Sequence, residues 1–524
     1  MITKLPDEFL SVISENNGLR MYLSNLSKGR QFTPRSWLYE NQDPQTVLDN
    51  WLNELSTLEN GDTFEKKVFQ FDTSQLKKWG PQGGIKPISE LLSDVVEPTF
   101  ANGDSPRPKA FSSREWSGAK LQAIRDFHDC GVYALRPAAY SNVVADMRAR
   151  DTLESNSGWP DFTRRNKPEV LQAAIKAASN DEWIDYPAIA LFRNYNLKTR
   201  LVWMFPEATN IKEGSYCQPM QSRIVNSRLY VYAPWEGFER VRFLVTQHYD
   251  QGEFLSASDF SSTDAHFTLP ATMEVFDVLS HIMQKGYAGG LRQSLQRMHE
   301  IPLIIGPDEM LASKHGVASG SNWTNFVETV FDHIFSTYVQ YHTEGYNTNA
   351  LCAIGDDMCW VSSKYDDALA KTLEQCGKEV GQDLNAEKVT NDEDSVKFLQ
   401  RLFQRGYRRP DGQLRGVYST IRALKSSVYP ERFHKPSDWN SDMFCARQYM
   451  ILENCVDHPL FEQFVKYVVH GQRDLIPFAS KSTAELNKIT RQTKLIPGFN
   501  PTYNQEKRDT SLGNFESIRI ARSL

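Results

Sequence analysis

The chain has 524 residues, of which 40% are apolar, 12% aromatic and 24% charged, an ordinary composition that excludes a disordered or collagen-like protein. The formal net charge of −6 and the pI of about 6.1 argue against a protein that coats itself in nucleic acid, but they leave room for a basic channel inside an acidic body. The 7 cysteines include no C-x-x-C pair, and we find no membrane span or signal peptide, so we expect a soluble, cytosolic protein with reduced thiols.

The first hundred residues mix short helical patterns with turns. Pro- and Gly-rich loops at 81–84 and 102–106 follow, so we expect a boundary near residue 110. Beyond it, short apolar runs at 191–192 and 201–204 lie on either side of a charged patch, which favours a pair of strands.

The middle of the chain carries the clearest periodic signals. Residues 253–259 predict a buried strand that ends on a carboxylate, and residues 327–338 have the apolar spacing of an amphipathic helix. The apolar runs 350–354 and 358–361 surround Gly355-Asp356-Asp357, which predicts a β-hairpin with an acidic turn.

The second half of the chain changes from mixed to helical. We expect a helix over 364–376 and a strand over 396–403, followed by a turn at 410–412. Beyond residue 419 the pattern is mostly helical, and the polar segment 481–524 is expected to be an irregular tail. This order of elements predicts an α+β core with an α-rich end.

Two acidic positions have the chemistry of a metal site. Asp259 ends the first of these strands, with Asp264 shortly after it, and Asp356 and Asp357 form the hairpin turn. Nucleotidyl transfer uses two divalent cations roughly 4 Å apart, and aspartates on adjacent strand ends supply the oxygen ligands that Mg²⁺ prefers. Neither position is specific alone, because acidic hairpin tips and strand-terminal aspartates are both common.

A third feature is the segment 319–324, a loop that opens directly into the amphipathic helix. Gly316 and Gly320 allow its backbone to turn tightly, so the loop can pack against a nascent base pair. Its hydroxyl groups have the chemistry to contact a ribose 2′-OH. The alternative is an ordinary Ser/Thr cap of the helix.

Basic residues gather in three places, each of which is either a solvated surface or a site for an anion. The clusters are Arg164, Arg165 and Lys167; Arg193, Lys198 and Arg200; and Arg405, Arg408, Arg409 and Arg415. Such clusters are compatible with an acidic protein if the cations line an interior channel.

The order of these features resembles motifs A, B and C of viral RNA-dependent RNA polymerases. The matching residues are Asp259 with Asp264, Ser319 and Gly320 with Thr324, and Gly355-Asp356-Asp357. Motif style and chain length are most similar to the polymerases of small bisegmented double-stranded RNA viruses, the picobirnaviruses and partitiviruses, with the picobirnaviruses favoured.

The resemblance implies roles for further residues. Asp259 and Asp356 are expected to bridge both metal ions, with help from Asp357. Lys388 looks like the motif D general acid that protonates the pyrophosphate leaving group, with a plain surface lysine as the alternative. Motif F is expected to hold the triphosphate through Arg193, Lys198 and Arg200. Motif G is expected at the template entry, at Ser157 and Gly158. Motif E, the primer grip, is expected at 396–399.

One position departs from the family pattern. Many positive-strand RNA virus polymerases carry an Asn four residues after the motif B threonine, where it pairs with the second motif A aspartate to select ribose. This chain has Glu328 there. The expected sugar-reading residues are Asp264, Ser319 and Thr324, with Asn325 as an alternative.

The fold implied by the resemblance is a right hand with fingers, an antiparallel palm sheet backed by helices, and an α-rich thumb around an encircled active site. Its expected divisions are an N-terminal region bridging fingers and thumb (1–115), fingers (116–250), palm with motif A (251–270), a fingers insertion (271–305), palm with motifs B to E (306–405), and thumb with the C-terminal tail (406–524). Polymerases of this kind often start without a primer, and the tail from residue 481 is a candidate platform or plug in the cavity.

The implied activity is template-directed RNA synthesis from ribonucleoside triphosphates, for replication and transcription of a viral RNA genome. Mg²⁺ is the expected cofactor, with Mn²⁺ as an alternative. The expected partners are template RNA, product RNA, ribonucleoside triphosphates and a viral capsid protein, but not a membrane. The expected location is the virion interior and the host cytoplasm.

Two other functions stay open. A reverse transcriptase shares the palm, but it usually has a Tyr-x-Asp-Asp turn, whereas Ile354-Gly355 precedes the aspartates here and Asp264 favours ribonucleotides. A non-enzymatic RNA-binding or capsid-associated protein with a chance Gly-Asp-Asp is the second alternative. It would bind RNA without consuming nucleotides.

Overall fold

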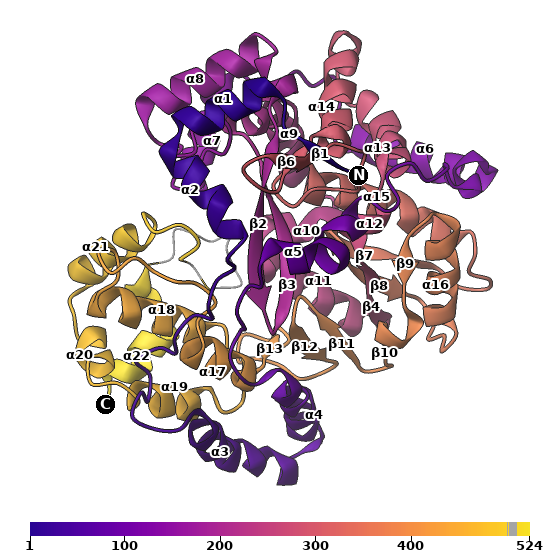
Figure 1. Ribbon diagram of the computed structural model, residues 1–524. Helices are drawn as coiled ribbons and strands as arrows, with labels where there is room; N and C mark the ends of the chain where they lie inside the picture. Colours follow the sequence, from indigo (N-terminus) through magenta and orange to yellow (C-terminus); the bar gives the residue numbers. More distant parts are fainter. Residues whose placement is uncertain (500, 502–510) are drawn as a thin grey trace.

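The computed structural model describes residues 1–499, 501 and 511–524, which form three sheets surrounded by helices (Figure 1). The first two sheets include strands that are far apart in the sequence, so the fold depends on long-range pairing. Within these described ranges, no helix is long and apolar enough to cross a membrane.

The first sheet ties the start of the chain to its middle, in the order β1-β6-β5-β2-β3. Its β2–β3 hairpin confirms the paired strands expected around the charged patch. The hairpin turns at Asn196 and Leu197, which both have left-handed backbone conformations. The strands are β1 (Ile2–Lys4), β2 (Ala188–Tyr195), β3 (Lys198–Met204), β5 (Leu303–Ile304) and β6 (Glu309–Leu311).

The central sheet has the order β10-β4-β8-β7 and is covered on both faces. Side chains alternate along β8, so Met358 and Trp360 join the core on the α15 side, while Cys359 joins the core on the α11 side. The elements are β4 (Phe254–Ser261), β7 (Thr348–Ile354), β8 (Asp357–Ser362), β10 (Thr390–Asn391), α11 (Phe238–Asp250) and α15 (Trp323–Gln340).

Two elements of this sheet were expected from the sequence and are confirmed, namely the β7–β8 hairpin and the helix α15. The strand expected at 253–259 exists as β4, but the expectation that it ends on Asp259 is wrong. It continues to Ser261 because its last two residues pair with β9 (Asp383–Leu384). Asp259 therefore lies inside a strand, where it pairs with Asp357 of β8.

The third sheet, β11-β12-β13, corrects another expectation. The single strand expected over 396–403 is a hairpin that turns at Leu399 and Gln400, both with positive φ. Tight hairpin turns usually carry Gly, Asn or Asp, so an apolar–amide pair gave no turn signal. The strands are β11 (Ser395–Phe398), β12 (Arg401–Gln404) and β13 (Val417–Tyr418).

The helix expected over 364–376 is α16 (Leu369–Glu379), which begins and ends later. Its start is delayed because the Asp366 carboxylate accepts a hydrogen bond from the Ala368 backbone at 2.9 Å and holds a turn there. An aspartate two residues before an amide is a common turn former, so the delay is local in origin.

The C-terminal helical region, residues 419–499 and 511–522, shares one hydrophobic core with the N-terminal helices α3 (Pro44–Leu55) and α4 (Thr63–Thr73). The expectation of an irregular tail from 481 is wrong for two helices, α21 and α22, and residues 500 and 502–510 of that tail lie outside the described residues. The helices are α17 (Thr420–Val428), α18 (Ser441–Glu453), α19 (Phe461–Val469), α20 (Leu475–Ala479), α21 (Thr483–Thr493) and α22 (Glu516–Arg522).

The N-terminal segment also packs against the first sheet. Ile13 and Leu19, from its first two helices, share a small core with Ile189 of β2 and Ile304 of β5. The chain start therefore contacts two separate parts of the molecule, the first sheet and the C-terminal helical region. The remaining longer helices are α1 (Asp7–Glu15), α2 (Asn17–Leu26), α6 (Arg114–Asp129), α7 (Tyr140–Ala149), α8 (Pro168–Ser179), α9 (Glu207–Ser227), α13 (Leu269–Ser280) and α14 (Ala288–Glu300).

Candidate active site

Three aspartates meet where the central strands pair. The register of β4 and β8 sets Asp259 directly opposite Asp357. Asp356 lies in the turn between β7 and β8, and its carbonyl oxygen accepts a hydrogen bond from the Phe260 amide at 3.2 Å. The expected acidic hairpin turn is confirmed, and backbone pairing brings the carboxylates of two separate segments to one place.

Gly355 makes this turn possible. Its φ is +59°, a conformation that residues with a side chain rarely adopt. A Cβ there would lie 3.1 Å from Nδ2 of Asn325 and 3.3 Å from Oε2 of Glu328, both on α15. The Gly355 amide donates a hydrogen bond to Thr329 Oγ1 at 2.9 Å, so the turn rests against this helix.

Burial raises the pKa of all three carboxyls, and in two of them a neighbouring carboxylate adds to the rise. Burial and the charges of Asp356 and Asp259 raise the pKa of Asp357 to about 7. Burial also raises the pKa of Asp356, with Asp259 adding to the effect. Burial raises the pKa of Asp259 too, although the charge of Lys388 acts in the opposite direction. A site that crowds buried negative charge in this way is stabilised by cations.

The donor set suits hard divalent cations, because every candidate ligand is a carboxylate oxygen. Among the residues that the structure describes, no three His, Cys, Asp or Glu side chains form a ready-made cage. Mg²⁺ rarely needs one, since it is commonly held by one or two carboxylates together with substrate phosphate oxygens and water. The residues present therefore fit metal ions that complete their coordination with substrate.

Two more acids lie behind the turn on α15. Glu328 is 8% exposed and Asp332 is fully buried. Burial and the nearby charge of Asp356 raise the pKa of both carboxyls well above the usual range. Both Asp332 oxygens lack a hydrogen-bond partner among the described residues. The sequence singled out Glu328 only as a departure from the family pattern and gave no sign of Asp332.

The 319–324 loop is closed by its own hydroxyl groups. Thr324 Oγ1 donates to the Ala318 carbonyl at 2.5 Å, and Ser319 Oγ accepts from the Trp203 amide at 3.3 Å. Neither of these side chains caps α15, but Ser321 Oγ accepts a hydrogen bond from the first helical amide, Trp323 N, at 3.1 Å, so the alternative of a Ser/Thr cap holds at Ser321. Gly320 is required by space, because a Cβ there would lie 1.7 Å from the Trp203 carbonyl oxygen.

The other two sugar-reading candidates differ in their surroundings. Asn325 lies beside the acidic turn, and its Oδ1 accepts a hydrogen bond from Trp235 Nε1 at 3.1 Å. Asp264 is exposed on α12 (Thr263–His266), which follows β4. Its negative charge helps to raise the pKa of Glu328. Asn325 and Asp264 therefore both lie near the acidic turn and near Glu328.

The expected triphosphate-binding cations share one face of the β2–β3 hairpin. Arg193 pairs across the strands with Arg200, and Tyr195 pairs with Lys198. Arg200 is near enough to the carboxylates to oppose the rise in the pKa of Asp356. Arg193 instead forms an ion pair with Glu431 of the C-terminal helical region, at 2.7 Å.

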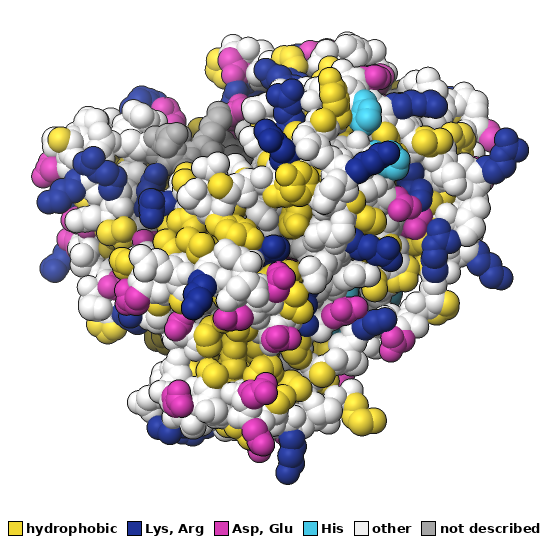
Figure 2. Space-filling view, turned by 90° about the horizontal axis from the view of Figure 1, so that it is seen from above, with side chains coloured by type: hydrophobic (Ala, Val, Ile, Leu, Met, Phe, Trp, Pro, Cys, Tyr) yellow, Lys and Arg dark blue, Asp and Glu magenta, His cyan; other side chains and the backbone are white. Residues whose placement is uncertain are grey.

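The same hairpin closes over a cavity of about 950 Å³. Its tip is bonded to α17, because Arg422 donates to Tyr195 Oη at 2.8 Å and Lys425 donates to Asn196 Oδ1 at 2.5 Å. Basic residues outnumber acidic ones in the lining, and the arginines are Arg150, Arg193, Arg242, Arg401, Arg422, Arg432 and Arg447. On the face seen in Figure 2, by contrast, Lys and Arg are interspersed with Asp and Glu.

Comparison with known proteins agrees with this geometry. A family model described as viral RNA-dependent RNA polymerase matches residues 196–418. The sequence is 28% identical over 482 residues to a potential RNA-dependent RNA polymerase of a human picobirnavirus (strain Human/Thailand/Hy005102/-), covering 87% of this chain and 86% of the relative. The central part of this chain, residues 196–418, is that of a viral RNA-dependent RNA polymerase.

Solved structures show the same fold. The crystal structure of the RNA-dependent RNA polymerase of a human picobirnavirus superposes with a TM-score of 0.82 at 23% identity, covering 99% of this chain and 100% of that one. An insertion-loop deletion mutant of a human picobirnavirus polymerase gives a TM-score of 0.81 at 24% identity, with the same coverage. The expected right-hand polymerase fold is therefore confirmed.

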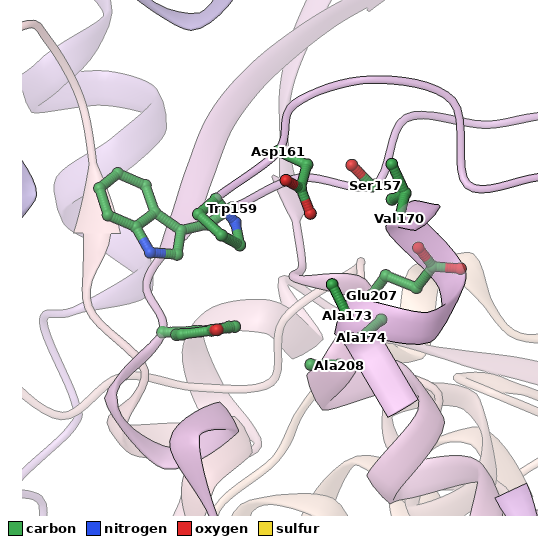
Figure 3. A pocket seen from close by; sticks show the side chains of 10 residues that line it. Ser157, Trp159, Asp161, Val170, Ala173, Ala174, Glu207 and Ala208 are labelled. Carbon is green, nitrogen blue, oxygen red and sulfur yellow. The ribbon is translucent and has the colours of Figure 1, made fainter. Parts of the chain in front are cut away.

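The two residues expected to form motif G, Ser157 and Gly158, contact the protein itself. Ser157 is buried, and its carbonyl accepts from the Glu207 amide at the start of α9, at 2.9 Å. Gly158 has φ +66°, and a Cβ there would lie 2.7 Å from the Phe205 carbonyl oxygen. Figure 3 shows Ser157, Asp161 and Glu207 lining a small pocket of about 90 Å³ at this junction. Contact with template stays a prediction.

Lys388 lies close to the carboxylates of the polymerase. It ends a short helix at 386–388, and its Nζ donates to Ser261 Oγ at 3.4 Å, two residues beyond Asp259. Its charge lowers the pKa of Asp259 against the effect of burial. Lys388 is exposed, so its expected role as the general acid stays a prediction beside the alternative of a surface lysine.

Proposed function

We propose that this polymerase extends an RNA strand on an RNA template by two-metal nucleotidyl transfer, for replication and transcription of a viral RNA genome. The observation that carries the proposal is the β4–β8 register, which sets Asp259 opposite Asp357 with Asp356 in the adjoining turn. The 3′-hydroxyl of the growing strand attacks the α-phosphate of a paired ribonucleoside triphosphate, and pyrophosphate leaves.

Asp259 and Asp356 would hold two Mg²⁺ ions, with Asp357 assisting and Mn²⁺ as a substitute metal. Bound there, the ions stabilise the attacking and leaving oxygens of the displacement. Lys388 donates a proton to the leaving pyrophosphate oxygen. Its closeness to Ser261 and its effect on Asp259 support this role.

The nucleotide is bound between the β2–β3 hairpin and the acidic turn. Arg200 and Lys198 neutralise the triphosphate, and Arg193 joins them when its ion pair with Glu431 opens. The sugar lies near Asp264 and Asn325. The hydrogen bonds of Ser319 and Thr324 within the protein support a role in shaping this pocket, together with Gly320.

We assign the regions of the hand from these contacts. Residues 116–250 and 271–305 are fingers, 251–270 and 306–405 are palm, and 406–524 are thumb with tail. Residues 1–115 bridge fingers and thumb, which is supported by their packing on both the first sheet and the C-terminal helical region. Template enters past Ser157 and Gly158.

The proposed partners are template RNA, product RNA and ribonucleoside triphosphates, with a viral capsid protein as a further partner. The proposed location is the virion interior and the host cytoplasm. The tail from residue 481 is proposed to act as a platform or plug in the cavity during initiation. Parts of that tail, Thr490 to Phe499, line the cavity, which supports this role.

Removal of divalent metal tests the proposal. With an RNA template and all four ribonucleoside triphosphates, we expect Mg²⁺-dependent synthesis that excess chelator stops completely and added Mg²⁺ restores. Chelation should leave the protein folded and lower the melting temperature only slightly, because the cations stabilise the local carboxylates while the fold is held by its hydrophobic cores. Deoxyribonucleotides should be incorporated far less well. Synthesis in chelator, or equal use of both sugars, would overturn the proposal.

A further inference from the structure

The loop 319–322 is held from outside by two residues of α9. Asn210 Nδ2 donates to the Gly320 carbonyl at 3.1 Å, and the Asn210 carbonyl accepts from Asn322 Nδ2 at 2.9 Å. Glu213 accepts from the Asn322 amide at 3.1 Å and from the Ser321 hydroxyl. Four hydrogen bonds therefore fix a loop that the family pattern places beside the nucleotide.

Glu213 supports the start of α15 from another helix, together with Ser321, whose hydroxyl accepts a hydrogen bond from the Trp323 amide at 3.1 Å and donates to Glu213. The α15 helix begins at Trp323, and its own Asn322 makes no capping hydrogen bond. Glu213 is 1% exposed and brings a carboxylate to this N-terminus, where unpaired amides and the helix dipole favour negative charge. Burial raises the pKa of Glu213 to about 7, even though the hydrogen bonds from Ser321, Asn210 and Asn322 act to lower it.

The same two residues connect to the template-entry loop through Arg165. Its Nη2 donates to Asn210 Oδ1 at 2.8 Å, and its Nε donates to the Asn156 carbonyl at 3.0 Å. Asn210 in turn donates to Glu213 Oε1 at 2.9 Å. The segment before Ser157 and the loop around Gly320 are therefore attached to one buried network.

We propose that Glu213, with Asn210 and Arg165, is a positioning unit that fixes the 319–322 loop for nucleotide selection and couples it to the template-entry loop. The inference rests on the proposed function, in which this loop shapes the ribose pocket. None of the three residues needs to touch the nucleotide. Freeing the loop moves the backbone of Ser319 and Gly320, and a small displacement of a positioning group is costly to binding and rate.

The test compares Glu213→Ala and Glu213→Gln with wild type on one primed RNA template. We expect Glu213→Ala to raise the KM for the ribonucleotide about tenfold and to reduce the ribose-to-deoxyribose preference by a similar factor. Glu213→Gln keeps an acceptor for the Asn322 amide and should recover most of both losses. A purely structural role would change stability without moving the sugar preference.

Glu274→Gln is the matched control. Glu274 is another glutamate buried in the protein, and it accepts hydrogen bonds from Trp116 Nε1 and Lys120 Nζ, both at 3.0 Å, away from the loop. The Glu274→Gln variant should be less stable than wild type but keep the wild-type KM and sugar preference. If Glu213→Ala does not fold, Asn210→Ala is compared with wild type in its place, because this substitution does not change the charge of the protein.

The outcomes separate the two proposals. An active wild type, with Glu213→Ala or Asn210→Ala unchanged in KM and sugar preference, would overturn the positioning role alone. A shift of the same size in Glu274→Gln would also overturn it. A folded wild type that incorporates no nucleotide would overturn the proposed function and this inference with it.

Discussion

Asp356→Asn should reduce nucleotide incorporation by about 10³-fold or more, while the protein stays folded and melts at or above the wild-type temperature. The loss follows because a neutral amide is a poor ligand for a hard cation. The gain in stability follows because burial and the charge of Asp259 already raise the pKa of Asp356, so its ionised form costs free energy in the folded state.

Asp367→Asn is the control for Asp356→Asn. Asp367 lies in the exposed turn before α16 and has the same charge, but it is not part of the acidic turn. Primer extension and thermal unfolding of both variants check the prediction. Near-normal extension by Asp356→Asn would show that catalysis does not need the Asp356 carboxylate. A large drop in the melting temperature of this variant would show that the carboxylate stabilises the fold, against the prediction.

Asp72→Ala should lower the free energy of unfolding by about 3–5 kcal/mol, the largest effect on stability that we expect from one side chain outside the active site. Asp72 is fully buried on α4 and accepts hydrogen bonds from residues at the start of α17 and from a histidine near α19. The donors and distances are Ser419 Oγ (2.6 Å), Thr420 Oγ1 (2.6 Å), Thr420 N (3.2 Å), Ile421 N (3.0 Å) and His458 Nε2 (2.8 Å).

The pH dependence of this effect has a definite sign. Burial raises the pKa of Asp72, but the hydrogen bond and charge of His458 and the hydroxyls of Ser419 and Thr420 outweigh it, so the pKa is lowered overall. A carboxyl with a lowered folded-state pKa stabilises the protein above its unfolded-state pKa. That stabilisation is lost as the pH falls through the folded-state value. The gap between wild type and Asp72→Ala should therefore narrow in acid.

Urea unfolding followed by tryptophan fluorescence measures the Asp72→Ala prediction. Asp49→Ala is its control, because Asp49 is exposed on the neighbouring helix α3 and should change stability by only about 0.5 kcal/mol. Equal losses in the two variants would contradict the role given to Asp72. So would a difference that grows as the pH is lowered.

The active-site hairpin was predictable because its signals are local. Two apolar runs surround a Gly-Asp-Asp turn, and the amphipathic helix before them has regular spacing. What the sequence cannot state is the register of β4 on β8, which sets Asp259 opposite Asp357 across about a hundred residues. The order of family motifs supplied that link instead of any periodicity.

Other parts of the site gave little or no signal. Arg193 was expected to bind the triphosphate, but in the structure it forms an ion pair with Glu431, which is far from it in the sequence. Arg165 was noted only as one of several clustered basic residues, whereas it donates to Asn210 and to a backbone carbonyl. Asn210 and Glu213 look like ordinary polar helix residues in the sequence. Their role depends on tertiary contacts that no local pattern records.

Template-dictated incorporation tests the central claim most directly. Four primed RNA templates that differ only in the first unpaired base would each be offered one ribonucleoside triphosphate at a time, with Mg²⁺. We predict that each template accepts its complementary nucleotide and rejects the other three, and that Asp356→Asn accepts none. Incorporation that ignores the template base, or RNA binding with no incorporation by the folded wild type, would contradict the assignment of this chain as an RNA-directed RNA polymerase.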